Sequence, residues 1–113
     1  MAQTKLRTEQ IETLPRVSSS ASGDITPTKV DFDRYVRTAQ AAAITISNPT
    51  MEIGEVMAVQ ITGSSAQTLS FGADYVALDG LPLPASTTAN KTMEIIITKW
   101  ASGKVGVSYV NEA

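Results

Sequence analysis

Two segments of this chain, Glu55–Thr62 and Thr92–Trp100, alternate apolar with other residues, and this constrains the fold more than any other feature. A period of two belongs to a β-strand, because successive side chains of an extended backbone point to opposite faces. Each segment therefore predicts a strand with one face turned toward a core. The residues of these faces are Met57, Val59 and Ile61 in the first segment and Met93, Ile95 and Ile97 in the second.

The second segment departs from clean alternation at Ile96, which stands between Ile95 and Ile97. An apolar residue on the side that should be polar favours a strand buried on both faces. The cover on the second face would come either from another sheet or from a neighbouring subunit. Ile96 is therefore a candidate interface residue.

Turn residues divide the rest of the chain into further short segments rich in β-branched and aromatic residues. The whole is predicted to be all-β, as a small antiparallel β-sandwich or jelly-roll-like barrel of about seven strands, preceded by an N-terminal arm. The additional strand segments are Lys29–Thr38, Ile44–Ser47, Gln67–Phe71, Tyr75–Leu78 and Val105–Val110, and the turns are Asn48-Pro49, Gly63-Ser64-Ser65, Asp79-Gly80 and Ala101–Lys104.

The first part of the chain differs in composition from the remainder. Val17–Gly23 reads Val-Ser-Ser-Ser-Ala-Ser-Gly, which is typical of a flexible linker. We therefore predict an arm and Ser-rich linker at residues 1–23 and a β domain at residues 24–113.

Three apolar residues of the arm, Leu6, Ile11 and Leu14, would share one face if the segment before Pro15 were helical. Three apolar side chains on one short helix cannot hold it in water. The arm is therefore either a frayed tail or a segment that orders on a partner or pairs with copies of itself. In the second case these three residues make the anchoring contacts.

The composition excludes several kinds of chemistry. The 113 residues contain no Cys and no His, which removes thiol nucleophiles, disulfides, imidazole acid/base catalysis and zinc sites of the usual kind. The net charge of −2 gives no basic patch for nucleic acid, and no apolar stretch suggests a secretory signal or a membrane span. The charged fraction of 18% is low, so association with other chains would help to cover the surface.

Few groups invite a catalytic interpretation, and none supports it. Asp31 and Asp33 would share a strand face, but they lack the further oxygen ligands of a calcium loop, and we interpret them as solvated surface acids. The Ser-rich segments lack a partner base. We therefore predict no enzyme activity, no cofactor and no metal.

The aromatic residues leave two alternatives open. Tyr35, Tyr75 and Trp100 could contact a glycan or an interface, and core packing is the other use of such side chains. Trp100 lies beside a polar turn. The proline-flanked loop with Leu81 and Leu83 is a further candidate for contact with a partner.

Five elements carry a family resemblance. They are Asp33–Pro49, Val56–Ile61, Thr68-Leu69-Ser70-Phe71-Gly72, Thr87-Thr88-Ala89-Asn90-Lys91, and the final strand and hairpin Ile95–Trp100 and Ser102–Val107. In this order they resemble small β domains of tailed-bacteriophage virion proteins, which occur in tail fibres, head fibres and capsid or collar appendages. Two departures are that Gly54 comes late after the Asn-Pro turn and that Trp100 precedes the final hairpin turn.

The resemblance implies a non-enzymatic structural protein of the virion, on the capsid or tail surface. It implies a homotrimer whose N-terminal segment anchors it to other virion proteins of the capsid, portal or tail, with the β domain projecting outward. The alternative is a receptor- or glycan-binding module at a fibre tip. No nucleic-acid or membrane partner is expected.

Overall fold

The structure is a computed structural model that describes residues 16–78 and 82–113. Its three longest strands lie at the centre of the fold. β4 (Val56–Thr62), β7 (Thr92–Ala101) and β8 (Lys104–Asn111) pair antiparallel, with β7 in the middle. Buried and half-buried residues alternate along β7 from Thr92 to Thr98, as the period of two predicts. The inward residues of β4 and β7 are those expected from the sequence.

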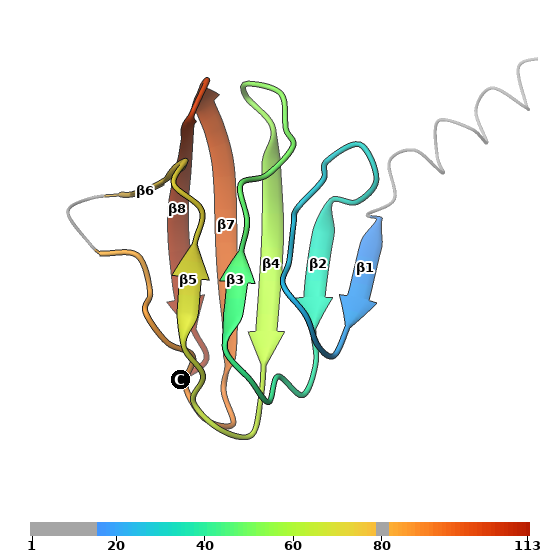
Figure 1. The fold of residues 1–113 in the computed structure, drawn as a ribbon, viewed down its shortest axis with the longest axis vertical. Helices are drawn as coiled ribbons and strands as arrows, with labels where there is room; N and C mark the ends of the chain where they lie inside the picture. The colour runs from blue at the N-terminus through green and yellow to red at the C-terminus, as the bar shows by residue number, and fades with distance from the viewer. Residues whose placement is uncertain (1–15, 79–81) are drawn as a thin grey trace, which may run out of the picture.

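Three shorter strands complete a six-stranded sheet. β2 (Arg34–Arg37) lies parallel to β4, and β1 (Val17–Ser20) lies parallel to β2 at one edge. At the other edge, β6 (Tyr75–Ala77) lies parallel to β8. The strand order is therefore β1-β2-β4-β7-β8-β6 (Figure 1).

A second sheet of two strands lies over the centre of the first. β3 (Ile44–Ile46) and β5 (Leu69–Phe71) pair in parallel, and Figure 1 shows them in front of β4, β7 and β8. Their inward side chains, Ile44, Ile46 and Leu69, join one hydrophobic cluster with the inward residues of the larger sheet. The core therefore lies between the two sheets. Burying each such side chain contributes about 1.5–3 kcal/mol to the stability of the fold.

The described residues are all-β, as predicted, and they form eight strands in two sheets. The prediction of antiparallel sheets is wrong for four pairs, because β1–β2, β2–β4, β3–β5 and β6–β8 are parallel. The cause is the path of the chain. After β2 it passes through β3 in the smaller sheet and returns as β4, so it re-enters the larger sheet in the same direction.

The Ser-rich segment also differs from its prediction as a flexible linker. Val17–Ser20 forms the edge strand β1, and residue by residue it pairs with Arg34–Arg37. The predicted strand at Lys29–Thr38 is shorter than expected, because a turn closed by hydrogen bonds to the Thr28 carbonyl precedes β2. The sheet therefore begins at Val17, ahead of the boundary expected after residue 23. Residues 1–15 lie outside the described part, so the arm stays a prediction.

Gly63 provides a test of how closely two loops approach one another. A Cβ atom at this buried position would lie 2.4 Å from the backbone oxygen of Gln40. Because backbone atoms cannot move aside cheaply, Gly63→Ala is expected to lower the free energy of unfolding by roughly 1–3 kcal/mol, measured by urea denaturation. The control is Ser64→Ala at the exposed neighbouring position, with an expected change within about 0.5 kcal/mol. Equal stabilities for the two variants would contradict the close approach.

Candidate functional site

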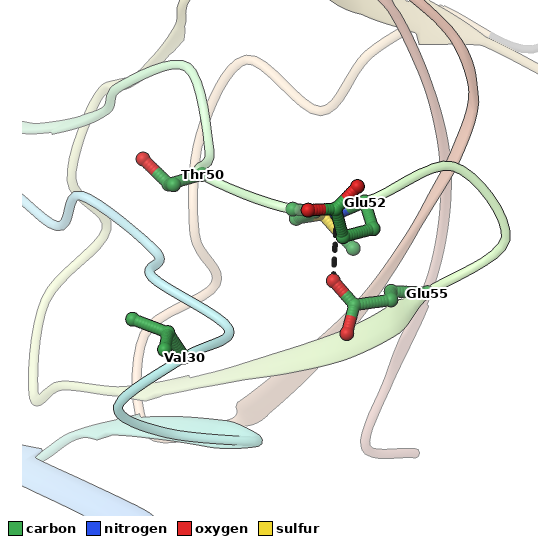
Figure 2. A pocket seen from close by; sticks show the side chains of 5 residues that line it. Val30, Thr50, Glu52 and Glu55 are labelled. Carbon is green, nitrogen blue, oxygen red and sulfur yellow. Dashed lines mark hydrogen bonds between the residues drawn. The ribbon is translucent and has the colours of Figure 1, made fainter.

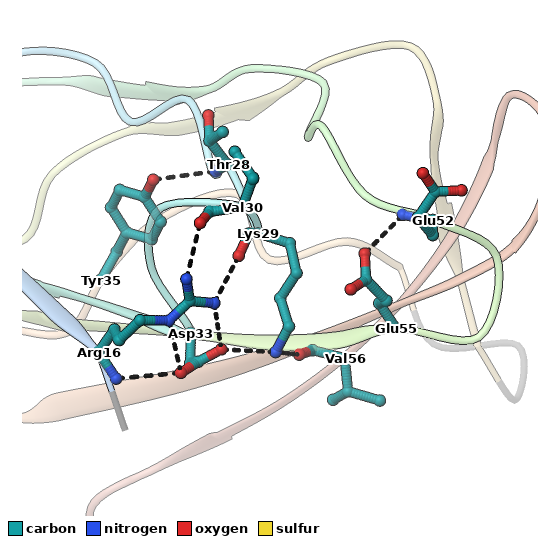
Figure 3. Close-up of polar contacts among 9 residues, drawn as sticks. All are labelled: Arg16, Thr28, Lys29, Val30, Asp33, Tyr35, Glu52, Glu55 and Val56. Atoms are coloured by element: carbon teal, nitrogen blue, oxygen red, sulfur yellow. Dashed lines mark hydrogen bonds and ion pairs between the residues drawn. The ribbon is translucent and has the colours of Figure 1, made fainter. Parts of the chain in front are cut away.

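The start of β1 is held by Arg16, whose guanidinium reaches across to the turn before β2 (Figure 3). Its Nε and Nη2 atoms donate to the Asp33 carboxylate at 3.3 and 3.1 Å. Its Nη1 and Nη2 atoms also donate to the carbonyls of Val30 and Lys29 at 2.6 and 2.8 Å. The Arg16 backbone N–H donates to Asp33 at 3.0 Å. This fork uses the planar geometry that makes arginine a multidentate donor.

Lys29 adds a second cation to the same carboxylate. Its Nζ atom lies 2.7 Å from Asp33 Oδ1 and donates to the Val56 carbonyl at 3.2 Å. The hydrogen bonds from Arg16, then those from Lys29, hold the pKa of Asp33 well below its ordinary value of 3.8. We call the set of Arg16, Lys29 and Asp33 the clasp. It fixes the point at which the preceding residues join the sheet.

A shallow pocket lies next to the clasp, between the turn before β2 and the loop before β4 (Figure 2). It has a volume of about 210 Å³ and is lined by Val30, Thr50, Met51, Glu52 and Glu55. Glu55 folds back so that its Oε1 accepts the Glu52 backbone N–H at 2.6 Å. The lining therefore combines apolar side chains with carboxylates that could face a cationic group.

Three of the residues predicted as contacts belong to the core or its margin. The Tyr75 hydroxyl donates to the Ser47 carbonyl at 2.8 Å, and burial, followed by the charge of Asp74, raises its pKa above the usual range. The Tyr35 hydroxyl accepts the Thr28 N–H at 2.9 Å, and its ring packs against the cluster. Leu83 is half-buried against the same cluster. Tyr75 is therefore unsuited to contact a ligand.

Ile96 and Trp100 lie on the opposite side of the larger sheet from the core. Ile96 is half-buried between its strand neighbours, opposite Ala58 and Ser108. Trp100 is half exposed, and its ring covers Gly106, where an added Cβ would lie 2.5 Å from a ring carbon. Trp100 and Tyr75 thus lie on different faces and do not share a platform. Leu6, Ile11, Leu14 and Leu81 lie outside the described residues.

The clasp was not expected from the sequence. The sequence indicates a solvated acid at Asp33, as at Asp31, and it places Arg16 within the predicted arm and linker of residues 1–23. The signal that could have found the clasp is weak. It consists of one arginine directly before a segment with strand potential and of Lys29 and Asp33 at a spacing of four residues.

Comparisons with family models, with curated proteins and with solved structures found no match to this chain. Among residues 16–78 and 82–113, no group of three or more acidic side chains lies close enough to hold a metal ion. The same residues contain no helix of the length and hydrophobicity that crossing a membrane requires.

The clasp predicts a pH dependence of stability. The folded-state pKa of Asp33 is lower than its unfolded value, so its contribution is present above the unfolded value of 3.8 and is lost as the pH falls below it. Asp33→Asn should therefore reduce stability at neutral pH, and the difference from wild type should shrink below about pH 4. Urea unfolding at a series of pH values measures this.

Asp31→Asn is the matched control, because Asp31 is an exposed carboxylate two residues away on the same turn. It should leave the stability close to that of wild type across the same pH series. A constant difference between wild type and Asp33→Asn at all pH values would contradict an ionised, clasped Asp33.

Proposed function

We propose that this chain is a non-enzymatic structural protein of a bacteriophage particle. Residues 1–15 anchor it to other virion proteins, and the β domain, a small sandwich of the two sheets, projects from the capsid or tail surface. The order of sequence elements that resembles virion domains supports this proposal. So does the low charged fraction of 18%, which suits a chain covered by neighbours.

The observation that carries the proposal is the clasp. An anchoring segment can hold its domain at one place on a particle only if the segment and the domain are firmly joined. The Arg16 guanidinium and backbone N–H together make five hydrogen bonds to the turn before β2. These bonds tie Arg16 to the turn before β2, so an anchoring segment at residues 1–15 would join the domain at a fixed point of the backbone.

The pocket beside the clasp gives this proposal a second support. Its carboxylates, Glu52 and Glu55, lie where a basic partner segment could approach, next to the exposed apolar side chain of Val30. A virion protein that docks at this end would bury Val30 and pair with the two carboxylates. The end of the domain that carries the pocket would then face the particle, and the opposite end would project from it.

Deletion of residues 2–15 tests the proposal in the phage that encodes the chain. Purified particles should contain the full-length protein, detected by mass spectrometry. The truncated protein retains Arg16 and should fold with the same circular dichroism spectrum, but particles should lack it. Absence of the full-length protein from particles would overturn the structural role. Equal incorporation of both forms would overturn the anchoring role alone.

A receptor- or glycan-binding function is the second candidate, and the exposure of Trp100 favours it. A half-exposed tryptophan ring such as that of Trp100 offers a stacking surface for sugars. In this case Trp100→Ala should reduce adsorption of particles to host cells by tenfold or more, which is about 1.4 kcal/mol. The control is Ser64→Ala, at an exposed turn position beyond the end of β7 that is remote from Trp100. Unchanged adsorption by Trp100→Ala would remove this candidate.

A further inference from the structure

Most of the exposed large apolar side chains of the described residues lie on one side of the six-stranded sheet. Seven such side chains are exposed, and the pairing register directs five of them away from the core. We call this side the outer face. Its five exposed apolar residues are Val17, Val56, Val76, Trp100 and Val110.

Further apolar residues fill the middle of the outer face between these exposed ones. Val36 of β2, Ala58 of β4 and Ile96 of β7 have the same orientation and are half-buried by their strand neighbours. Neutral polar side chains lie between these apolar ones, among them Gln60, Thr98 and Ser108, so the outer face is mixed but carries few charges. This composition is that of a typical protein interface, in which charged residues are depleted at the centre. The smaller sheet covers only the other side (Figure 1).

The charges in the middle of the outer face neutralise each other. Arg34 forms an ion pair with Glu94 across β4, and its Nη2 also donates to Gln60 Oε1 at 2.6 Å. Lys104, the remaining charged residue at an outward strand position, lies at the rim beside the turn between β7 and β8. The outer face therefore carries no unpaired charge at its centre that would repel an identical face.

The size of the outer face suits a stable association. Each strand residue occupies about 16 Å² of sheet plane, so strands of the lengths given above present a plane of roughly 570 Å². Because the side chains project from this plane, the accessible area of the outer face is larger than the area of the plane. The result approaches the ~800 Å² that each partner contributes to a standard protein interface.

We infer that the outer face packs against further copies of this chain. A surface without net charge at its centre offers nothing for a strongly charged partner to recognise, whereas it is complementary to itself. Ile96 lies at the centre of this contact, which explains why an isoleucine stands on the side of β7 that does not face the core. The inference does not depend on the proposed function, because it concerns only how copies of the chain associate.

The purified full-length protein tests this inference without any phage component. Sedimentation equilibrium from about 1 to 100 μM should give an oligomeric mass, because stable interfaces of standard size have affinities that range from micromolar to far tighter. Ile96→Lys places an unpaired ammonium at the centre of the contact and should shift the protein to monomer, with a loss of at least a hundredfold in affinity.

A second variant guards against a folding defect in Ile96→Lys. Val56 is 48% exposed and lies opposite Thr98, so Val56→Lys leaves the core untouched and should also weaken association. The control is Val30→Lys, because Val30 is 74% exposed and lies on the other side of the sheet from Val56 (Figure 3). It should associate like wild type.

Three results would overturn the inference. One is a wild-type protein that is still monomeric at about 100 μM, well above the micromolar concentrations at which interfaces of standard size associate. Another is an oligomer whose affinity is unchanged in both Ile96→Lys and Val56→Lys while circular dichroism shows that both variants are folded. The third is that deletion of residues 2–15 abolishes that same oligomer, in which case the association would belong to the arm and not to the outer face.

Discussion

The burial of one face of β4, β7 and β8 is the constraint on which the remaining structure depends. These three strands form a regular antiparallel sheet, but a sheet with a bare apolar face is not stable in water. β3 and β5 provide the cover, although each has only three residues and could not persist alone. Ile44, Ile46 and Leu69 hold them in place through contacts with the larger sheet.

The smaller sheet is too narrow to cover β2, and a polar side chain covers the inward side of β2 in its place. Arg37 lies on the inward side of β2 and is only 1% exposed. Its Nε donates to Ser20 Oγ of β1 at 3.0 Å, and its Nη1 donates to Gln40. Burial lowers its pKa, while the charge of Asp24 acts in the opposite direction. A long side chain that is hydrogen-bonded at its tip thus closes the margin of the core where no strand lies over it.

The predictable part of this fold is the part that depends on local periodicity. The inward residues of β4 and β7 follow directly from alternation, because the period of two is a property of the backbone. The direction of the strands was not predictable in this way, since it depends on whether the chain crosses between sheets. β1 was missed because Ser-rich composition is typical of linkers, and pairing with β2 overrides that preference. The clasp was missed because an isolated arginine forms no pattern.

The few ion pairs of the described residues are divided between the two sides of the larger sheet. The ion pairs of the described residues lie either at the clasp, where Arg16 and Lys29 share Asp33, or between Arg34 and Glu94. The clasp lies on the side of the sheet that carries the smaller sheet and the loops. Arg16 directs its guanidinium to that side, away from the outer face.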